Sequence, residues 1–284
     1  MQIVRFSRDG GPAQVGILRG DKIASLPQPG GLSELLAKPL EEIRKLLAAA
    51  DAEIPLAAAR MLAPIDGRME VWAAGVTYER SRDARVEESG QTTVYDSIYD
   101  ADRPELFFKS PAWRVTTNGE PIGIRADTRS CIPEPEFAVV ANRYGEIVGA
   151  TVCNDMTART IEADNPLYLP QAKIFEGSCG IAHGIRPWWE LATPADLAIS
   201  LEISRAGQTH FAGSSSTRQL RRDPQTLLSW LFRAQPFPDG VILSTGTGIV
   251  PPLELSLQPG DEITIDIQDV GTLRQSVQGS RYDR

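Results

Sequence analysis

The stretch EPEFAVVANRYGEIVGATVCNDMTAR, residues 134–159, decides how the rest of the chain is interpreted. It contains two short apolar runs, residues 137–141 and 147–152, separated by the turn-like sequence Asn-Arg-Tyr-Gly at residues 142–145. Two apolar runs joined by such a turn are typical of a β-hairpin. The stretch therefore predicts two antiparallel, largely buried strands.

Three acidic side chains are expected on one face of this hairpin. Pairing the strands around the turn places Glu136 opposite Thr151 and Glu134 opposite Cys153, with Asp155 two residues further on. Opposite residues, and residues two apart on a strand, share a face. The three carboxylates would crowd together and repel one another unless a cation lies among them. Oxygen ligands suit magnesium, manganese or calcium, although a solvated strand face with scattered acids gives the same pattern.

Composition limits the class of protein. The chain has 284 residues, 42% of them hydrophobic, which suffices for one large domain or for a large and a small one. A net charge of −8 without basic clusters argues against nucleic acid or an anionic membrane as partner. The charged start and the lack of a long apolar run predict neither signal peptide nor membrane span. The 3 cysteines indicate a reducing cytoplasm without a disulfide framework.

Two domains are expected. Residues 1–26 show three short strand signals, and two short helices should follow, the first with Ser33 as its N-cap. An Ala- and Pro-rich connector, residues 51–68, then precedes many short strands. We therefore expect a small N-terminal α/β domain over residues 1–66 and a larger, mostly β domain over residues 67–284.

Further blocks accompany the hairpin in a characteristic order. The sequence AGVTY lies at residues 74–78, PELFFK at residues 104–109 and STGTG at residues 244–248, and Lys173 follows the hairpin. Together with E-P-E and N-D-M-T-A-R, these blocks resemble the G-x-N-Y, P-x-x-F-x-K, T-G-T, E-x-E and D-[VM]-[ST]-x-R patterns of the fumarylacetoacetate hydrolase superfamily. The resemblance implies a mixed β-roll (α+β) with a small N-terminal α/β domain, and a homodimer or higher homo-oligomer.

The resemblance also implies roles for matching residues. Magnesium, with manganese or calcium as alternatives, would be held by Glu134, Glu136 and Asp155. Lys173 would hold the oxyanion of the substrate, and Thr247 would bind the substrate carboxylate. In the branch that dehydrates 2-keto-3-deoxy sugar acids, a glutamate at the position of Glu105 acts as acid and base, whereas Lys109 is expected to form a structural ion pair.

One departure from the family pattern concerns the charged, helix-prone segment that begins at residue 79. Hydrolases of the family carry a water-activating histidine in this lid, and here the comparable position holds Ser81. The chain has 2 histidines, both far from this motif in the sequence. The segment is either a solvated charged helix or a lid that meets an anionic substrate. We expect Arg82 to bind the substrate; the other candidates for specificity are Arg80, Arg85, Tyr95 and Tyr99.

A hard cation on three carboxylates leaves positions open for the carboxylate and keto oxygens of a 2-oxo acid. As a Lewis acid it would stabilise the enolate and acidify C3–H. A hydroxyl on C4 then leads to dehydration. A carbonyl on C4 instead allows water to cleave the C3–C4 bond, as in acylpyruvate hydrolysis, and oxaloacetate decarboxylation uses the same enolate.

The sequence thus predicts a metal-dependent hydro-lyase that converts a 2-keto-3-deoxy pentonate, such as the arabinonate or xylonate, into 2-oxoglutarate semialdehyde. Glu105 would supply the base and then the acid, and Lys173 would neutralise developing charge. Alternatives are a C–C bond hydrolase of acylpyruvates, which the missing lid histidine disfavours, and an isomerase or decarboxylase of 2-oxo acids. A non-catalytic binding protein is a further alternative, against which the intact acidic triad and Lys173 argue.

Overall fold

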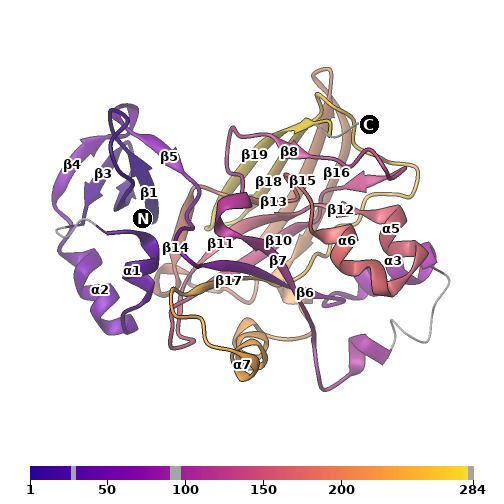
Figure 1. Ribbon diagram of the computed structural model, residues 1–284, viewed down its shortest axis with the longest axis horizontal. Coiled ribbons are helices and arrows are strands. Elements are labelled where there is room, and N and C mark those ends of the chain that lie inside the picture. Colours follow the sequence, from indigo (N-terminus) through magenta and orange to yellow (C-terminus); the bar gives the residue numbers. More distant parts are fainter. Residues whose placement is uncertain (27–29, 90–96, 281–284) are drawn as a thin grey trace.

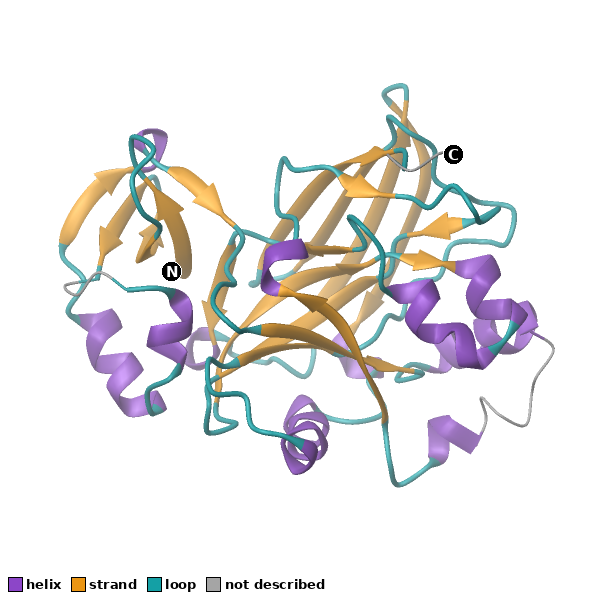
Figure 2. Cartoon of the chain, viewed as in Figure 1, coloured by secondary structure: helices purple, strands orange, loops and turns teal. Residues whose placement is uncertain are grey.

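The computed structural model describes residues 1–26, 30–89 and 97–280, and more of these residues lie in β-strands than in helices (Figure 2). The first part of the chain contains β1 (Gln2–Ser7), β2 (Gln14–Arg19), β3 (Lys22–Ser25), α1 (Leu32–Leu36), α2 (Leu40–Ala48), β4 (Ala52–Pro55) and β5 (Arg60–Leu62). The middle contains β6 (Glu70–Gly75), α3 (Glu79–Ser89), β7 (Glu105–Pro111), β8 (Ile122–Gly123), β9 (Cys131–Ile132), β10 (Pro135–Ala141), β11 (Ile147–Asp155), β12 (Thr157–Ala158), α5 (Arg159–Asp164) and α6 (Leu169–Lys173). The remainder contains β13 (Cys179–Ile181), β14 (Gly184–Pro187), β15 (Ala198–Arg205), β16 (Gln208–Ser216), α7 (Pro224–Ala234), β17 (Val241–Ser244), β18 (Glu262–Ile267) and β19 (Gly271–Gln278).

Two β-sheets form the body of the molecule (Figure 1). The larger runs in the order β4-β3-β2-β1-β14-β11-β10-β17-β6-β7, with β13 also paired to β11 and β5 to β1. The smaller runs in the order β16-β15-β18-β19-β8. Because β17 and β6 pair in parallel whereas β10 and β11 pair antiparallel, the larger sheet is mixed. This mostly β, mixed architecture confirms the expected fold class.

The central hairpin, β10 and β11, is covered on both faces. Phe137 and Val139 belong to a core shared with the smaller sheet, whereas Ala138 and Val140 belong to a second core that includes residues of α1 and α2. A strand covered on both faces shows no alternation of polar and apolar residues, which explains the continuous run of residues 137–141. The acidic residues at the end of this hairpin are therefore supported by packing from two sides.

The N-terminal part is joined to the larger sheet by backbone pairing. In β1, Ile3 pairs with Ile185 of β14, and residues of α1 and α2 share a core with the central hairpin. In Figure 1 this part lies at one end of the molecule, and α3, α5 and α6 lie at the other end. The expected domain boundary at residue 66 stays a prediction, because the sheet continues from one part into the other.

The expected register of the hairpin is wrong by two residues, yet the expected face is right. Glu136 pairs with Cys153, not with Thr151, and Glu134 lies opposite Asp155, whose N–H donates to the Glu134 carbonyl at 3.0 Å. One residue of the difference comes from a longer turn and one from a bulge next to Ala141. A shift of one residue would move side chains to the other face, and a shift of two restores them.

The start of α1 also differs from the expectation. The helix begins at Leu32 after Gly31, so Ser33 lies inside the helix and does not cap it. The cap comes instead from Asp66, whose carboxylate accepts hydrogen bonds from the backbone N–H groups of Leu32 (2.9 Å) and Ser33 (2.7 Å). The same carboxylate pairs with Arg5 at 3.1 Å. The carboxylate of Asp66, which is distant in the sequence, therefore caps α1 in place of the predicted hydroxyl of Ser33.

Replacing Asp66 with alanine should lower the free energy of unfolding by about 1–2 kcal/mol, because two helical N–H groups lose their acceptor. Urea denaturation followed by circular dichroism measures the change. Asp66→Asn keeps one carbonyl acceptor and should lose less. Equal losses in the two variants would show that charge, not capping, carries the effect.

Candidate metal centre and active-site cavity

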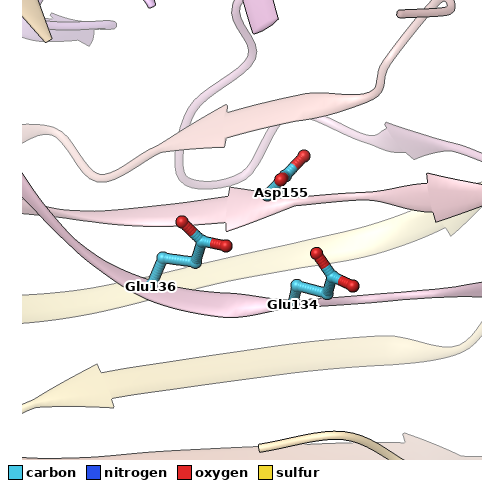
Figure 3. A group of neighbouring side chains, drawn as sticks. All are labelled: Glu134, Glu136 and Asp155. Atoms are coloured by element: carbon cyan, nitrogen blue, oxygen red, sulfur yellow. The ribbon is translucent and has the colours of Figure 1, made fainter. Parts of the chain in front are cut away.

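The three predicted carboxylates meet at the end of the hairpin (Figure 3). One oxygen each from Glu134, Glu136 and Asp155 lies within 4.8 Å of the other two, and all three residues are buried. Glu134 and Glu136 come from one strand and Asp155 from its neighbour, as the shared face requires. The solvated strand face considered from sequence is therefore excluded, because these acids are not in contact with bulk water.

Glu136 is fixed by the end of β17 and the loop that follows. Its Oε2 accepts hydrogen bonds from Ser244 Oγ at 2.5 Å and from the backbone N–H of Gly246 at 2.8 Å. Gly246 has a φ of +95°, and a Cβ there would overlap the hydroxyl of Thr77. The loop thus needs glycine in order to bring its N–H to the carboxylate.

Two buried lysines compensate Asp155. Lys109 Nζ lies 2.5 Å from Asp155 Oδ1, which confirms the expected ion pair, and Lys173 Nζ lies 3.1 Å from Asp155 Oδ2. Lys173 also contacts Glu134 and donates to Thr157 Oγ1 at 2.7 Å. Burial alone would raise the pKa of Asp155, but the charges of Lys109 and Lys173 outweigh burial and lower it.

The charges around the cavity are unbalanced in a way that fits a divalent cation. Burial raises the pKa of Glu136 to about 8, and the charges of Asp155 and Glu134 add to this effect. Among the described residues, five carboxyls face three cations here, so two negative charges would remain with every carboxyl ionised. The carboxyls are Glu105, Glu134, Glu136, Asp155 and Glu162, and the cations are Arg85, Lys109 and Lys173. An all-oxygen donor set with this charge suits magnesium, manganese or calcium.

A small cavity of about 60 Å³ adjoins the three carboxylates, room for about two water molecules. Glu105, Lys173 and Thr247 all line it, together with Ser81 and Arg85 of α3. Helix α3 forms part of the wall of this cavity.

Glu105 is positioned as a carboxyl group of altered acidity. It lies at the start of β7, partly buried, and packs against Gly75, where an added Cβ would overlap its carboxylate. Burial raises its pKa; Arg85 and Lys173 oppose that effect, and Glu134 and Asp155 add to it.

The expected lid is helix α3, and it is tied to the site by buried ion pairs. Arg85 lies 3.3 Å from Glu134 Oε1 through one guanidinium nitrogen and contacts Glu162 through the other. Glu88, one turn further along, pairs with Arg159 at 2.9 Å. The pairs Arg85–Glu162 and Glu88–Arg159 join α3 to α5, so the segment is not a fully solvated charged helix.

Other predicted residues lie as follows. Thr247 lines the cavity, and its hydroxyl lies 2.9 Å from the carbonyl oxygen of Pro135. Arg82 is not among the cavity-lining residues of the described chain; it pairs with Asp83 at 2.8 Å and lies over the Tyr99 ring. Tyr95 lies outside the described residues. Arg80 is exposed and pairs with Glu87.

Sequence reasoning missed Glu162 as a cavity residue. It lies in the first turn of α5, seven positions after Asp155, and is buried with 4% of its surface exposed. The only available signal was an acid at helical spacing from Arg159, and such acids are common on exposed helices. The hydroxyl of Ser81, where hydrolases carry histidine, is engaged with the backbone of Tyr78.

Magnesium binding should release protons near neutral pH. The folded, metal-free protein keeps a proton on Glu136 up to a pKa of about 8, well above the ordinary 4.5, and a cation among the three carboxylates displaces it. Calorimetric titration with magnesium at pH 7, in two buffers of different ionisation enthalpy, should detect release of about one proton per ion. An identical heat in both buffers would contradict the assignment.

The raised pKa of Glu136 also predicts how the free energy of unfolding of the metal-free protein depends on pH. Between pH 4.5 and about 8 the unfolded chain has released the Glu136 proton and the folded protein has not. The unfolded state therefore binds fewer protons, and the free energy of unfolding falls as pH rises through this window. Urea denaturation in chelator should show this fall in the wild type and a weaker fall in Glu136→Gln. Equal slopes would show that another group titrates.

Comparison with known proteins agrees with this site. A family model described as "Fumarylacetoacetate (FAA) hydrolase C-terminal" matches residues 70–278. The chain is 42% identical over 226 residues to "2-dehydro-3-deoxy-D-arabinonate dehydratase" of Saccharolobus solfataricus, covering 78% of this chain and 76% of the relative. It is also 42% identical over 214 residues to "Probable 2-keto-3-deoxyxylonate dehydratase" of Haloferax volcanii, covering 75% of this chain and 73% of the relative.

Solved structures of similar fold match 99% of the chain and point to the same group of relatives. The structure of "2-keto-3-deoxy-D-arabinonate dehydratase complexed with magnesium and 2,5-dioxopentanoate" superposes with a TM-score of 0.85 at 34% identity, covering 99% of this chain and 100% of that chain. A hexagonal crystal form of 2-keto-3-deoxyarabinonate dehydratase gives a TM-score of 0.87 at 35% identity, with the same coverage. The acidic triad, the mixed β fold and these matches together show that the chain belongs to the fumarylacetoacetate hydrolase family.

Proposed function

We propose that this chain is a magnesium-dependent hydro-lyase that converts a 2-keto-3-deoxy pentonate into 2,5-dioxopentanoate, the semialdehyde of 2-oxoglutarate. The observation that carries the proposal is the cavity in which Glu105 and Lys173 lie beside the acidic triad. The two dehydratases that share 42% identity with the chain support the same chemistry. So does the solved relative that holds magnesium and 2,5-dioxopentanoate.

The proposal assigns each group around the cavity a task. Glu134, Glu136 and Asp155 hold the magnesium ion, which when bound polarises the 2-oxo acid and makes its C3 protons acidic. Glu105 takes a proton from C3 and then delivers a proton to the departing C4 hydroxyl, a double use that suits a carboxyl group whose pKa burial has raised. Lys173, buried beside the triad, neutralises the negative charge that develops on the substrate.

Substrate anchoring is proposed for the opposite walls of the cavity. Thr247, on the glycine-containing loop, remains the proposed partner of the substrate carboxylate. The cationic partner is better sought in Arg85 than in Arg82, because Arg85 lines the cavity and Arg82 pairs with Asp83. A guanidinium can bind a carboxylate or a hydroxyl in defined geometry. Helix α3 forms part of the cavity wall, so an outward movement of α3 would widen the cavity for the substrate.

Acylpyruvate hydrolysis receives less support. The hydrolytic route needs a base that activates water, and the position of the family histidine is filled by Ser81, whose hydroxyl bonds to the backbone. No histidine is among the residues that line the cavity in the described chain. The elimination route needs only a carboxyl group near C3, which Glu105 provides.

Assembly and location complete the proposal. A homodimer in the cytoplasm is supported by the family resemblance and by 3 buried cysteines without a disulfide. A second hollow of about 800 Å³, lined in part by the exposed Trp113, offers a surface for another subunit.

None of the described helices has the length and apolar character needed to cross a membrane. Light scattering during size-exclusion chromatography tests the assembly, with a single-chain mass as the contrary result.

Proton NMR should show a 2-keto-3-deoxy pentonate converting to the aldehyde when magnesium is present. Glu105→Gln should slow the reaction by about two to four orders of magnitude, and Glu136→Ala should abolish it because the cation loses a ligand. Glu254→Gln, which changes an exposed glutamate outside the cavity, should react like the wild type.

An acylpyruvate offered in parallel separates the two reaction classes. The proposal expects no cleavage of this substrate. Formation of pyruvate and a carboxylic acid from the acylpyruvate, without aldehyde from the pentonate, would replace the dehydratase assignment with the hydrolase one.

A further inference from the structure

The proposed reaction breaks two carbon–hydrogen bonds, at positions two carbons apart. In the pentonate C4 and C5 carry hydroxyls, and in 2,5-dioxopentanoate C4 is a methylene and C5 an aldehyde. One molecule of water leaves, and C5 loses one hydrogen. Elimination of a C3 proton and the C4 hydroxyl therefore gives only the intermediate 5-hydroxy-2-oxopent-3-enoate. A second proton must then be taken from C5.

The C5 proton becomes acidic only after the first elimination. The new C3=C4 double bond conjugates C5 with the C2 carbonyl. Removal of the C5 proton forms C4=C5, moves the C3=C4 electrons to C2–C3, and places charge on the C2 oxygen. A proton added at C3 then leaves the enol of the C5 aldehyde, which tautomerises by gaining a proton at C4 and losing the one on O5. The active site consequently benefits from a second base beyond the one at C3.

The cavity contains two carboxyl groups outside the metal triad in the described chain, Glu105 and Glu162. They come from different elements, Glu105 from the start of β7 and Glu162 from α5. Glu105 is already assigned to C3 and C4 by the proposed function. Glu162 has no task in that scheme, although it is buried and lines the cavity.

Arg85 sets the position of Glu162 relative to the metal ligands. One terminal nitrogen of its guanidinium lies 3.3 Å from Glu134 Oε1, and the other contacts Glu162 Oε2. Glu162 is thus one guanidinium width away from a metal ligand. A 2-oxo acid that approaches the triad through C1 and C2 extends C5 three bonds beyond C2, a comparable reach. A base must be ionised before it accepts a proton, and the permanently charged guanidinium supplies the countercharge for that form.

We propose that Glu162, held by Arg85, is the base that removes the C5 proton in the second half of the reaction. This inference rests on the proposed function. It assigns the two cavity carboxyls that lie outside the triad to successive proton transfers, Glu105 at C3 and C4 and Glu162 at C5. It also explains why an acid that is not one of the predicted metal ligands is buried against the lid helix.

The test follows the two proton transfers separately by proton NMR in D₂O with magnesium. Exchange of the C3 protons reports the first transfer, and the aldehyde signal reports completion. Glu162→Gln should keep C3 exchange within about threefold of the wild type and slow aldehyde formation about a hundredfold or more. The conjugated intermediate should accumulate, with olefinic signals at C3 and C4. The matched control is Glu88→Gln, which removes a charge from the other α3–α5 ion pair but not from the cavity.

The outcomes separate the inference from the proposed function. Unchanged aldehyde formation by Glu162→Gln would overturn the inference alone. Parallel loss of exchange and of aldehyde in this variant would also overturn it, and would show that Glu162 only positions Arg85. The same separation of exchange and aldehyde formation in Glu88→Gln would attribute the effect to the lid and not to the base. A wild-type protein that forms no aldehyde from any 2-keto-3-deoxy pentonate would overturn both proposals.

Discussion

Repulsion among three buried carboxylates is the constraint on which the rest of this site depends. Glu134, Glu136 and Asp155 lie within reach of a single ion and are removed from bulk water. Such a cluster is stable only with compensation. Lys109 and Lys173 neutralise Asp155 from two sides, and donors at the end of β17 hold Glu136. The remaining negative charge makes a divalent cation the natural occupant.

The fold brings this compensation together from distant parts of the chain. The central hairpin is packed on both faces, so it can keep like charges in a fixed arrangement. β7 contributes Lys109 and Glu105, α6 contributes Lys173, and the loop after β17 supplies a backbone donor. Helices α3 and α5 close the cavity through paired charges. The active site is thus a junction of the large sheet with one group of helices, at the end of the molecule opposite the N-terminal part.

Much of this arrangement could be predicted because it depends on local pattern. The hairpin and the common face of its acids follow from the turn residues and the alternation of strand side chains. The order of the sequence blocks added the resemblance to the family. The predicted register was wrong because bulges and turn lengths leave no clear mark in a sequence. The prediction that the three acids share a face was nevertheless right, because the register differed by two residues and an even shift keeps side chains on the same face. The absence of the hydrolase histidine, whose position is occupied by Ser81, could also be recognised from the sequence. The identity of a residue at a motif position is visible without a structure.

What could not be predicted depends on contacts between remote elements. The cap of α1 by Asp66 joins residues far apart in sequence, and the ion pairs of Arg85 with Glu162 and of Glu88 with Arg159 depend on how α3 packs against α5. From sequence, Arg82 was expected to bind the substrate and Arg85 was only a further candidate on the same charged segment. Only the packing direction of that helix separates the one that reaches the cavity from the one that does not.

The central claim, that the crowded carboxylates form a divalent metal site, is tested most directly by crystals grown with manganese. Anomalous diffraction locates the ion without reference to activity. The account predicts one strong peak coordinated by a carboxylate oxygen from each of Glu134, Glu136 and Asp155. A triad without a peak at saturating manganese, or an ion bound only elsewhere on the chain, would contradict it.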